Sequence, residues 1–128
     1  MRCTFTPELR EHLSGLRQSS SSRFKSGRWT GSYRQFEMDH PQLLEVGFEK
    51  GLMVGTGADQ IGLFLIAGRY DEATATAEWL KHYIGRHTVL YSGRLSGTTL
   101  SGSWTIRTSV GVQTGSFTLV HSGDESQR

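Results

Sequence analysis

The chain has 128 residues, of which 16 are glycine, two are proline and one is cysteine, and its formal net charge is +2. This length fits one domain and excludes two independent folds. The single Cys3 excludes an internal disulfide and suits a reducing compartment, so we expect a cytoplasmic protein. No stretch approaches the roughly 20 apolar residues of a membrane span, the N-terminus lacks the apolar core of a secretory signal, and the small positive charge forms no basic stripe. We therefore expect neither a membrane nor a nucleic acid as partner.

Residues 1–26 are predicted to form a short N-terminal α-helix, over 6–16, and a serine-rich connector. Thr6 can cap this helix and Pro7 suits its first position. A helix of about 11 residues is marginally stable alone, so we expect its apolar stripe to pack over one end of the following domain or against a partner. The stripe consists of Leu9, Leu13 and Leu16.

From residue 27 to 123, alternating polar and apolar residues with short connections predict a single all-β domain, followed by a polar tail at 124–128. Connections this short allow only antiparallel neighbours, and eight such strands close into an up-and-down β-barrel. Residues 39–41 are predicted to form a turn or bulge, because Pro41 cannot donate a ladder hydrogen bond. The predicted strands are 28–37, 42–49, 51–57, 60–70, 74–84, 87–95, 98–108 and 112–121.

A glycine followed two residues later by an aromatic residue occurs five times in these strands. Residues two apart in a strand share a face, so each ring should lie beside a position without a side chain. Repeated glycines on successive strands let a sheet curl tightly enough to close, which favours a small barrel. The five pairs are Gly31 and Tyr33, Gly62 and Phe64, Gly68 and Tyr70, Gly102 and Trp104, and Gly115 and Phe117.

Alternation also predicts which side chains face the interior. Strand 60–70 is apolar on both faces near its middle, so we expect its outer face to meet the N-terminal helix or another subunit of a homo-oligomer. In strand 74–84, Trp79 and Tyr83 are placed inside, and Lys81 points inward with them. A buried ammonium needs a partner or loses its proton. Lys81 is therefore the most informative position in the predicted interior.

The side chains predicted to face inward form an aromatic wall with one amine and one imidazole. Such a wall suits a flat, partly aromatic or apolar ligand that is held by stacking. The same residues would also fill a narrow barrel, with Lys81 reaching out of one mouth, and both interpretations stay open at this point. The candidate ligand-binding residues are Trp29, Tyr33, Phe64, Trp79, Lys81, Tyr83, His87, Tyr91, Trp104 and Phe117.

Catalytic and metal-binding patterns are weaker. Lys81, Tyr83 and His87 could act as acid and base in a cavity, although His87 is better explained as satisfying backbone groups at a strand start. No carboxylate partner is found for them, because Glu78 has the wrong parity and Asp59 lies at a strand end, where it is expected to bond turn amides. The histidines lack the spacing of a zinc site. We therefore expect no metal ion, no cofactor and no catalytic residue.

A set of residues from Gly68 to Asp124 forms a recognisable pattern: Gly68–Asp71, Trp79, Lys81, Tyr83, His87, Ser92–Gly93, Trp104, Phe117 and Ser122–Asp124. This pattern resembles the later strands of avidin-type proteins and, more loosely, the wider calycin group that includes lipocalins. The resemblance implies an eight-stranded calycin-like barrel, frequently a tetramer, whose family members bind biotin between tryptophans. By this resemblance Trp79 and Trp104 would be ligand-facing walls, and Tyr33 a polar contact.

We therefore expect a barrel that binds a small, partly aromatic or apolar molecule without catalysis. Two alternatives stay open. The first is a cofactor-free isomerase or cyclase that uses the cavity as a mould, with Lys81, Tyr83 or His87 as acid or base. The second is a structural module in which strand 60–70 builds an oligomer or docks another protein. A lumen larger than about 300 Å³, the lower end for ligand pockets, would favour binding.

Overall fold

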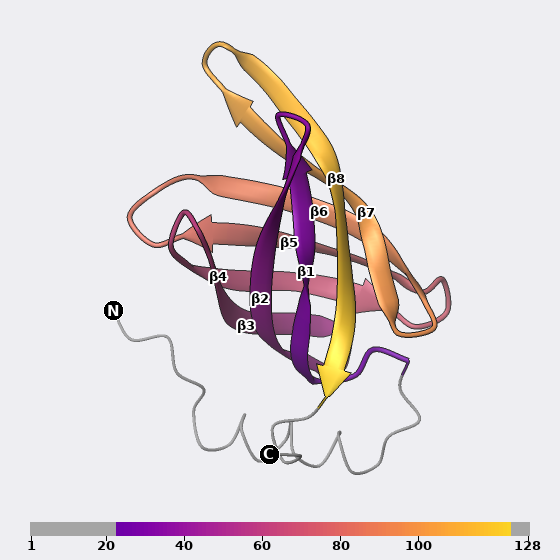
Figure 1. Cartoon of the computed structure of the whole chain (residues 1–128). Helices are drawn as coiled ribbons and strands as arrows, with labels where there is room; N and C mark the ends of the chain where they lie inside the picture. The colour runs from indigo at the N-terminus through magenta and orange to yellow at the C-terminus, as the bar shows by residue number, and fades with distance from the viewer. Residues whose placement is uncertain (1–22, 124–128) are drawn as a thin grey trace.

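The computed structural model describes residues 23–123, which form eight antiparallel strands closed into one barrel. Each strand pairs with its neighbours in sequence, and the last pairs back with the first (Figure 1). The predicted all-β, up-and-down barrel is confirmed, whereas the predicted helix at 6–16 and the tail at 124–128 lie outside the described residues. The strands are β1 (Gly27–Gln35), β2 (Met38–Glu49), β3 (Leu52–Asp59), β4 (Leu63–Asp71), β5 (Thr76–Tyr83), β6 (Thr88–Ser96), β7 (Thr99–Thr108) and β8 (Gly111–Gly123).

The first turn differs from the sequence prediction, which was wrong to place a turn or bulge at residues 39–41. The chain reverses at Phe36 and Glu37, which both have positive φ, at 54° and 62°, as a two-residue hairpin turn requires. Pro41 then pairs in register with Ser32 of β1. The ladder between β2 and β3 begins only at Gln42, so the missing N–H of Pro41 costs no hydrogen bond to β3.

Several strand glycines allow the strands to approach closely, as the sequence predicts, although Gly62 lies before β4 with open space around it; at Gly57 and Gly115 the ring that fills the gap comes from the neighbouring strand. Gly57 pairs with Phe64 across β3 and β4, and Gly115 pairs with Trp104 across β8 and β7. A Cβ atom added at Gly57 would collide with the Phe64 ring and with the carbonyl oxygen of Leu43. The bare positions therefore accept rings that would otherwise have no room inside so small a barrel.

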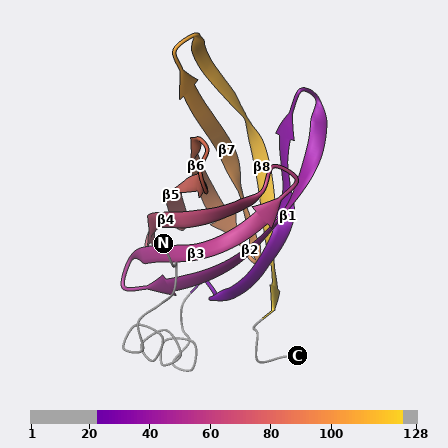
Figure 2. The ribbon, with the colours of Figure 1, turned by 90° about the vertical axis from the view of Figure 1, so that its left-hand side faces the viewer.

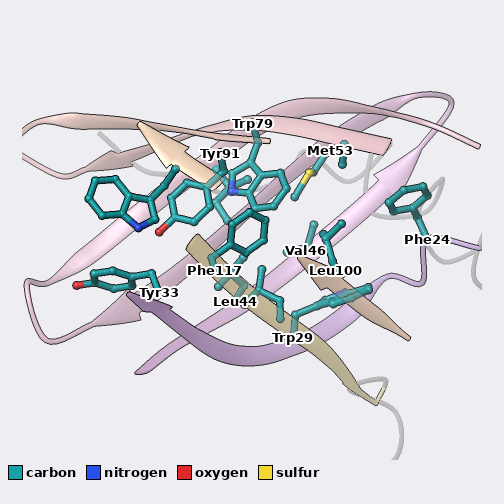
Figure 3. Close-up of a cluster of buried hydrophobic side chains, with 14 of the residues drawn as sticks. Phe24, Trp29, Tyr33, Leu44, Val46, Met53, Trp79, Tyr91, Leu100 and Phe117 are labelled. Carbon is teal, nitrogen blue, oxygen red and sulfur yellow. The ribbon is translucent and has the colours of Figure 1, made fainter. Parts of the chain in front are cut away.

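One end of the barrel, which we call the closed end, is filled by aromatic side chains. The Phe24 ring lies 5.3 Å from that of Phe48 and 5.0 Å from that of Tyr70, between ring centroids. Trp29 packs on Phe48 and donates its indole N–H to the Lys25 carbonyl oxygen at 2.9 Å. Figure 3 shows Phe24 and Tyr33 at opposite ends of the interior cluster. Chain segments on either side of Gly27 thus seal the closed end.

The opposite end, which we call the open end, carries the turns β1–β2, β3–β4, β5–β6 and β7–β8. Two of these hairpins, β1–β2 and β7–β8, project beyond the rest of the barrel on the same side (Figures 1 and 2). The turns β2–β3, β4–β5 and β6–β7, by contrast, lie at the closed end. The barrel is therefore packed at one end and framed by long hairpins at the other.

The outer face of β4 is apolar, as predicted. Ala67 is in register with Val54 of β3 and with Leu80 of β5, and Leu80 is in register with Leu90 of β6, so an apolar row crosses four strands. Leu63, on the same face of β4, is 66% exposed. That the N-terminal helix or another subunit of a homo-oligomer packs on this face remains a prediction. No helix among residues 23–123 is long and apolar enough to cross a membrane.

Candidate functional site

A cavity of about 560 Å³ opens between the hairpins of the open end. Its volume lies within the range of about 300 to 1,000 Å³ that is usual for small-molecule sites. The walls are formed by aromatic and aliphatic side chains: Tyr33, Ile61, Tyr83, Val89, Tyr91, Trp104 and Ile106. The rim is polar and consists of Gln35, His87, Thr88, Arg107, Thr108 and Gln113.

Lys81 lies beneath this cavity in an ion pair with Asp59. The distance from Lys81 Nζ to Asp59 Oδ2 is 2.8 Å, and the two side chains are 2% and 0% exposed. The ammonium also donates to Gln42 Oε1 at 2.9 Å and to the Tyr91 hydroxyl at 3.2 Å. Lys81 thus has the partner that its burial demands, and its three protons are all used.

Four aromatic rings enclose the same ammonium. Lys81 Nζ lies 4.4 to 5.2 Å from their centroids, within the range of a cation–π interaction. This arrangement replaces water on the sides of the ammonium that the hydrogen bonds leave open. The rings belong to Tyr33, Phe64, Tyr83 and Tyr91.

Asp59 is the carboxylate that the sequence analysis did not find, and the prediction that Lys81 and Tyr83 lack such a partner was wrong. Its Oδ2 accepts from the Tyr83 hydroxyl at 2.6 Å as well as pairing with Lys81. Its Oδ1 accepts from the backbone N–H of Ile61 at 2.9 Å and of Gly62 at 3.4 Å. The predicted bond to turn amides is therefore confirmed. We call the buried group beneath the cavity, which consists of Gln42, Asp59, Lys81 and the four rings around the ammonium, the floor. The Asp59 carboxylate joins the β3–β4 turn to this floor.

Two signals in the sequence could have located the floor. Asp59 has the same parity as the inward Met53 and Gly57, but the predicted strand ended at residue 57, whereas β3 continues to Asp59. Gln42 likewise shares the parity of Leu44, which is buried on β2. Gln42 begins the predicted strand 42–49 and Asp59 lies beyond the predicted strand 51–57, and alternation gives little information at and beyond the ends of a predicted strand.

Burial shifts the protonation equilibria of the floor. It lowers the pKa of Lys81 to about 8, against the raising effect of the hydrogen bond and charge of Asp59. Burial, and then the hydrogen bond and charge of Asp59, raise the pKa of Tyr83. The pKa of Tyr91 is also raised, chiefly by burial. At neutral pH the lysine therefore carries its proton, and the phenols remain neutral hydrogen-bond donors.

Two buried polar atoms of the floor have no hydrogen-bond partner among residues 23–123: the Tyr33 hydroxyl and Gln42 Nε2. Burial and the charge of Asp59 raise the pKa of Tyr33, and a side-chain hydrogen-bond interaction with Tyr83 lowers it in part. The two hydroxyls do not meet the geometry of a full hydrogen bond, and the Tyr83 proton is donated to Asp59. Unpaired buried polar groups are uncommon in native structures, so these two atoms mark a place that calls for a partner.

The ten side chains predicted for the site separate into three groups. Five of them line the cavity: Tyr33, Tyr83, His87, Tyr91 and Trp104. Phe64 and Lys81 lie at its floor, in contact with one another. The remaining three lie deeper, where Trp79 and Phe117 pack on Tyr91 with centroids 5.3 and 4.9 Å away, and Trp29 fills the closed end.

His87 is the exception to the predicted inward orientation. It is exposed, and its ring lies 4.9 Å from that of Tyr83 at the cavity rim. The prediction that it faces the interior was wrong, because His87 precedes β6, which begins at Thr88, and a residue in a turn does not follow the alternation of the strands.

Within the described part of the chain, no cluster of three or more His, Cys, Asp or Glu side chains could hold a metal ion. No protein-family model matches this chain, and searches among curated proteins and solved structures found no match either. The eight-stranded antiparallel closed barrel is consistent with a calycin-like architecture. The fold is also compatible with ligand binding, and the finer assignment rests on the geometry of the open end.

Proposed function

We propose that this protein is a calycin-like barrel that binds one small, partly aromatic or apolar molecule in the cavity of its open end, without catalysis. The observation that supports this most is the contrast between the two ends of the barrel. Aromatic rings fill the closed end, and the hollow of about 750 Å³ beside its turns is lined mostly by polar and charged residues, whereas aromatic and aliphatic side chains surround about 560 Å³ of open space at the other end. A barrel that only needed a core would gain by filling both ends.

The composition of the cavity supports the same proposal. Its walls carry three tyrosines and one tryptophan, whose rings offer large flat surfaces at a low cost in conformational entropy. The hydroxyls of Tyr83 and Tyr91 are held from below, by hydrogen bonds with Asp59 and Lys81 respectively. An apolar pocket with a few fixed polar groups is the usual form of a small-molecule site.

Non-catalytic binding is favoured because the ionisable groups of the floor satisfy one another. All three protons of Lys81 are donated, and Asp59 accepts four hydrogen bonds or ion-pair contacts in total. A general acid or base needs a proton position that is open to the substrate. Breaking this network to provide one would leave a buried charge without a partner.

The binding proposal can be tested with a matched pair of tryptophan variants. Trp104 lies at the cavity and donates its indole N–H to the Arg34 carbonyl at 3.0 Å, and Trp29 makes the same kind of bond at the closed end. We expect 9-fluorenone to form a 1:1 complex in native mass spectrometry and to quench tryptophan fluorescence. Most of that quenching should disappear in Trp104→Phe and persist in Trp29→Phe.

The result that would overturn the proposal is equally specific. If neither 9-fluorenone nor any other flat aromatic molecule of a test panel forms a 1:1 complex, the cavity does not bind such ligands. If quenching is lost in Trp29→Phe and kept in Trp104→Phe, binding occurs at the wrong end of the barrel. Both variants lose the same type of hydrogen bond, so a general loss of stability would affect them alike.

A second candidate function, a cofactor-free isomerase, is favoured by one contact. The Tyr83 side chain lines the cavity and its hydroxyl donates to Asp59 at 2.6 Å, which links the cavity to a carboxylate through one phenol. We would then expect the protein to accelerate deuterium exchange at the α-carbon of 1-indanone in D₂O, and Tyr83→Phe to abolish the acceleration. An exchange rate equal to that in buffer would remove this candidate for enolisable ketones.

A further inference from the structure

The polar groups at the bottom of the cavity define the chemistry of its occupant, an inference that rests on the proposed function. We propose that the ligand carries an uncharged hydrogen-bond acceptor, such as the carbonyl oxygen of an aromatic ketone, and that Tyr33 and Tyr91 donate to it. The site would thus select neutral acceptors over both pure hydrocarbons and carboxylates.

The Tyr33 hydroxyl provides the first donor. Tyr33 lines the cavity, is 4% exposed, and has a hydroxyl with no hydrogen-bond partner among the described residues. A buried hydroxyl is stabilised when it donates to an oxygen atom. A ligand oxygen that accepts from Tyr33 would supply this bond, so the site favours ligands that carry an acceptor.

The Tyr91 hydroxyl provides the second donor. It accepts a hydrogen bond from Lys81 Nζ at 3.2 Å and interacts with the Gln42 side chain, whose Oε1 already accepts from Lys81, so its O–H can be directed at a ligand oxygen. An O–H group polarised by a cation behind it is a stronger donor. Figure 3 shows the hydroxyl ends of Tyr33 and Tyr91 on the same side of the interior cluster, away from Phe24.

The buried charges explain why the acceptor should be neutral. Lys81 and Asp59 already compensate each other, with side chains 2% and 0% exposed. A carboxylate placed among these groups would add a second buried negative charge with no cation to match it, which is strongly unfavourable. The charge of Asp59 already disfavours a negative oxygen on Tyr33. A carboxylate would instead remain in water near Arg107 at the exposed rim.

Three molecules with one tricyclic skeleton test this inference: 9-fluorenone has a neutral carbonyl, fluorene has no acceptor, and fluorene-9-carboxylate is an anion. We expect the ketone to bind tightest and the carboxylate weakest, by fluorescence titration and calorimetry. Tyr33→Phe and Tyr91→Phe should each weaken ketone binding by about 3- to 10-fold, the range of a single hydrogen bond. The affinity for fluorene, which has no acceptor, should change much less than that for the ketone, so the ratio of the two affinities isolates the hydrogen bond from any general effect on folding.

A second measurement reports on the hydrogen bonds directly. The infrared C=O stretch of bound 9-fluorenone should shift to lower frequency than in an apolar solvent, and the shift should shrink in each phenylalanine variant. Equal affinities for ketone and fluorene, or tightest binding of the carboxylate, would overturn the inference while leaving cavity binding intact. If none of the three molecules binds, the inference falls together with the proposed function.

Discussion

Asp59 and Lys81 form a buried ion pair that joins two strands of the barrel across a third. Their charged atoms are 2.8 Å apart, and β4 lies between the strands β3 and β5 that carry them. A charge buried alone costs several kcal/mol, whereas a well-bonded pair costs far less. Removal of either residue should therefore destabilise the folded state, because the charge of the other would remain buried without a partner.

Substitution of one member of the pair should destabilise the protein strongly. We expect Asp59→Asn to lower the free energy of unfolding by about 3–5 kcal/mol, because it leaves the Lys81 ammonium buried without a counter-charge. Lys81→Met should cost a similar amount. The double variant should lose clearly less than the sum of the two, in urea denaturation of all four proteins. Additive losses would show that the two side chains stabilise the barrel independently.

The stability of the barrel should depend on pH through Lys81. Its folded pKa of about 8 lies below the value of about 10.4 expected in the unfolded chain. Between these values the unfolded state binds more protons, so the free energy of unfolding should rise from pH 8 to pH 10, with a slope of at most about 1.4 kcal/mol per pH unit. Below pH 8 both states hold the proton, and this contribution is constant.

The direction should reverse at higher pH. Because the pKa values of Tyr83 and Tyr91 are raised in the folded state, the unfolded chain loses these protons first, near its usual tyrosine pKa of about 10. Stability should therefore fall above that pH. Urea titrations from pH 7 to pH 11 measure both effects. Lys81→Met is the control that should lack the rise, and a flat profile between pH 8 and pH 10 in the unmodified protein would contradict the assignment.

Two tyrosines of the cavity should respond in opposite ways to loss of the hydroxyl. Tyr83 donates to Asp59 at 2.6 Å, whereas the Tyr33 hydroxyl has no partner within the described structure. Hydrogen bonds to charged groups contribute about 1.5–3 kcal/mol, so Tyr83→Phe should lower the free energy of unfolding by about that amount. Tyr33→Phe should leave it unchanged or raise it slightly. Equal losses in the two variants would mean that Tyr33 is also bonded in the folded protein.

The sequence could predict the barrel because its signals are local and periodic. Alternation placed Trp79, Lys81 and Tyr83 inside, and the structure buries all three. The partner of Lys81 could not be found in the same way, since Asp59 lies 22 positions away and meets it only when β3, β4 and β5 are aligned. Whether the interior is hollow depends on how side-chain volumes add up around the ring of strands, which no single strand reveals.

The close approach of strands at glycine can be tested at Gly57. An added methyl group there would meet the Phe64 ring and the Leu43 carbonyl oxygen. Neither can move away easily, because Phe64 is buried in the core and Leu43 is paired in the ladder between β2 and β3. The reduced entropy of the unfolded chain favours alanine by about 0.4–1 kcal/mol, but overpacking costs about 1–3 kcal/mol and should prevail. Gly57→Ala should therefore lower the midpoint of thermal unfolding. Thr56→Val, on the exposed face of the same strand, should change it little, and Phe64→Leu in the Gly57→Ala background should restore part of the loss. A Gly57→Ala protein as stable as the unmodified one would show that this position does not need to be bare.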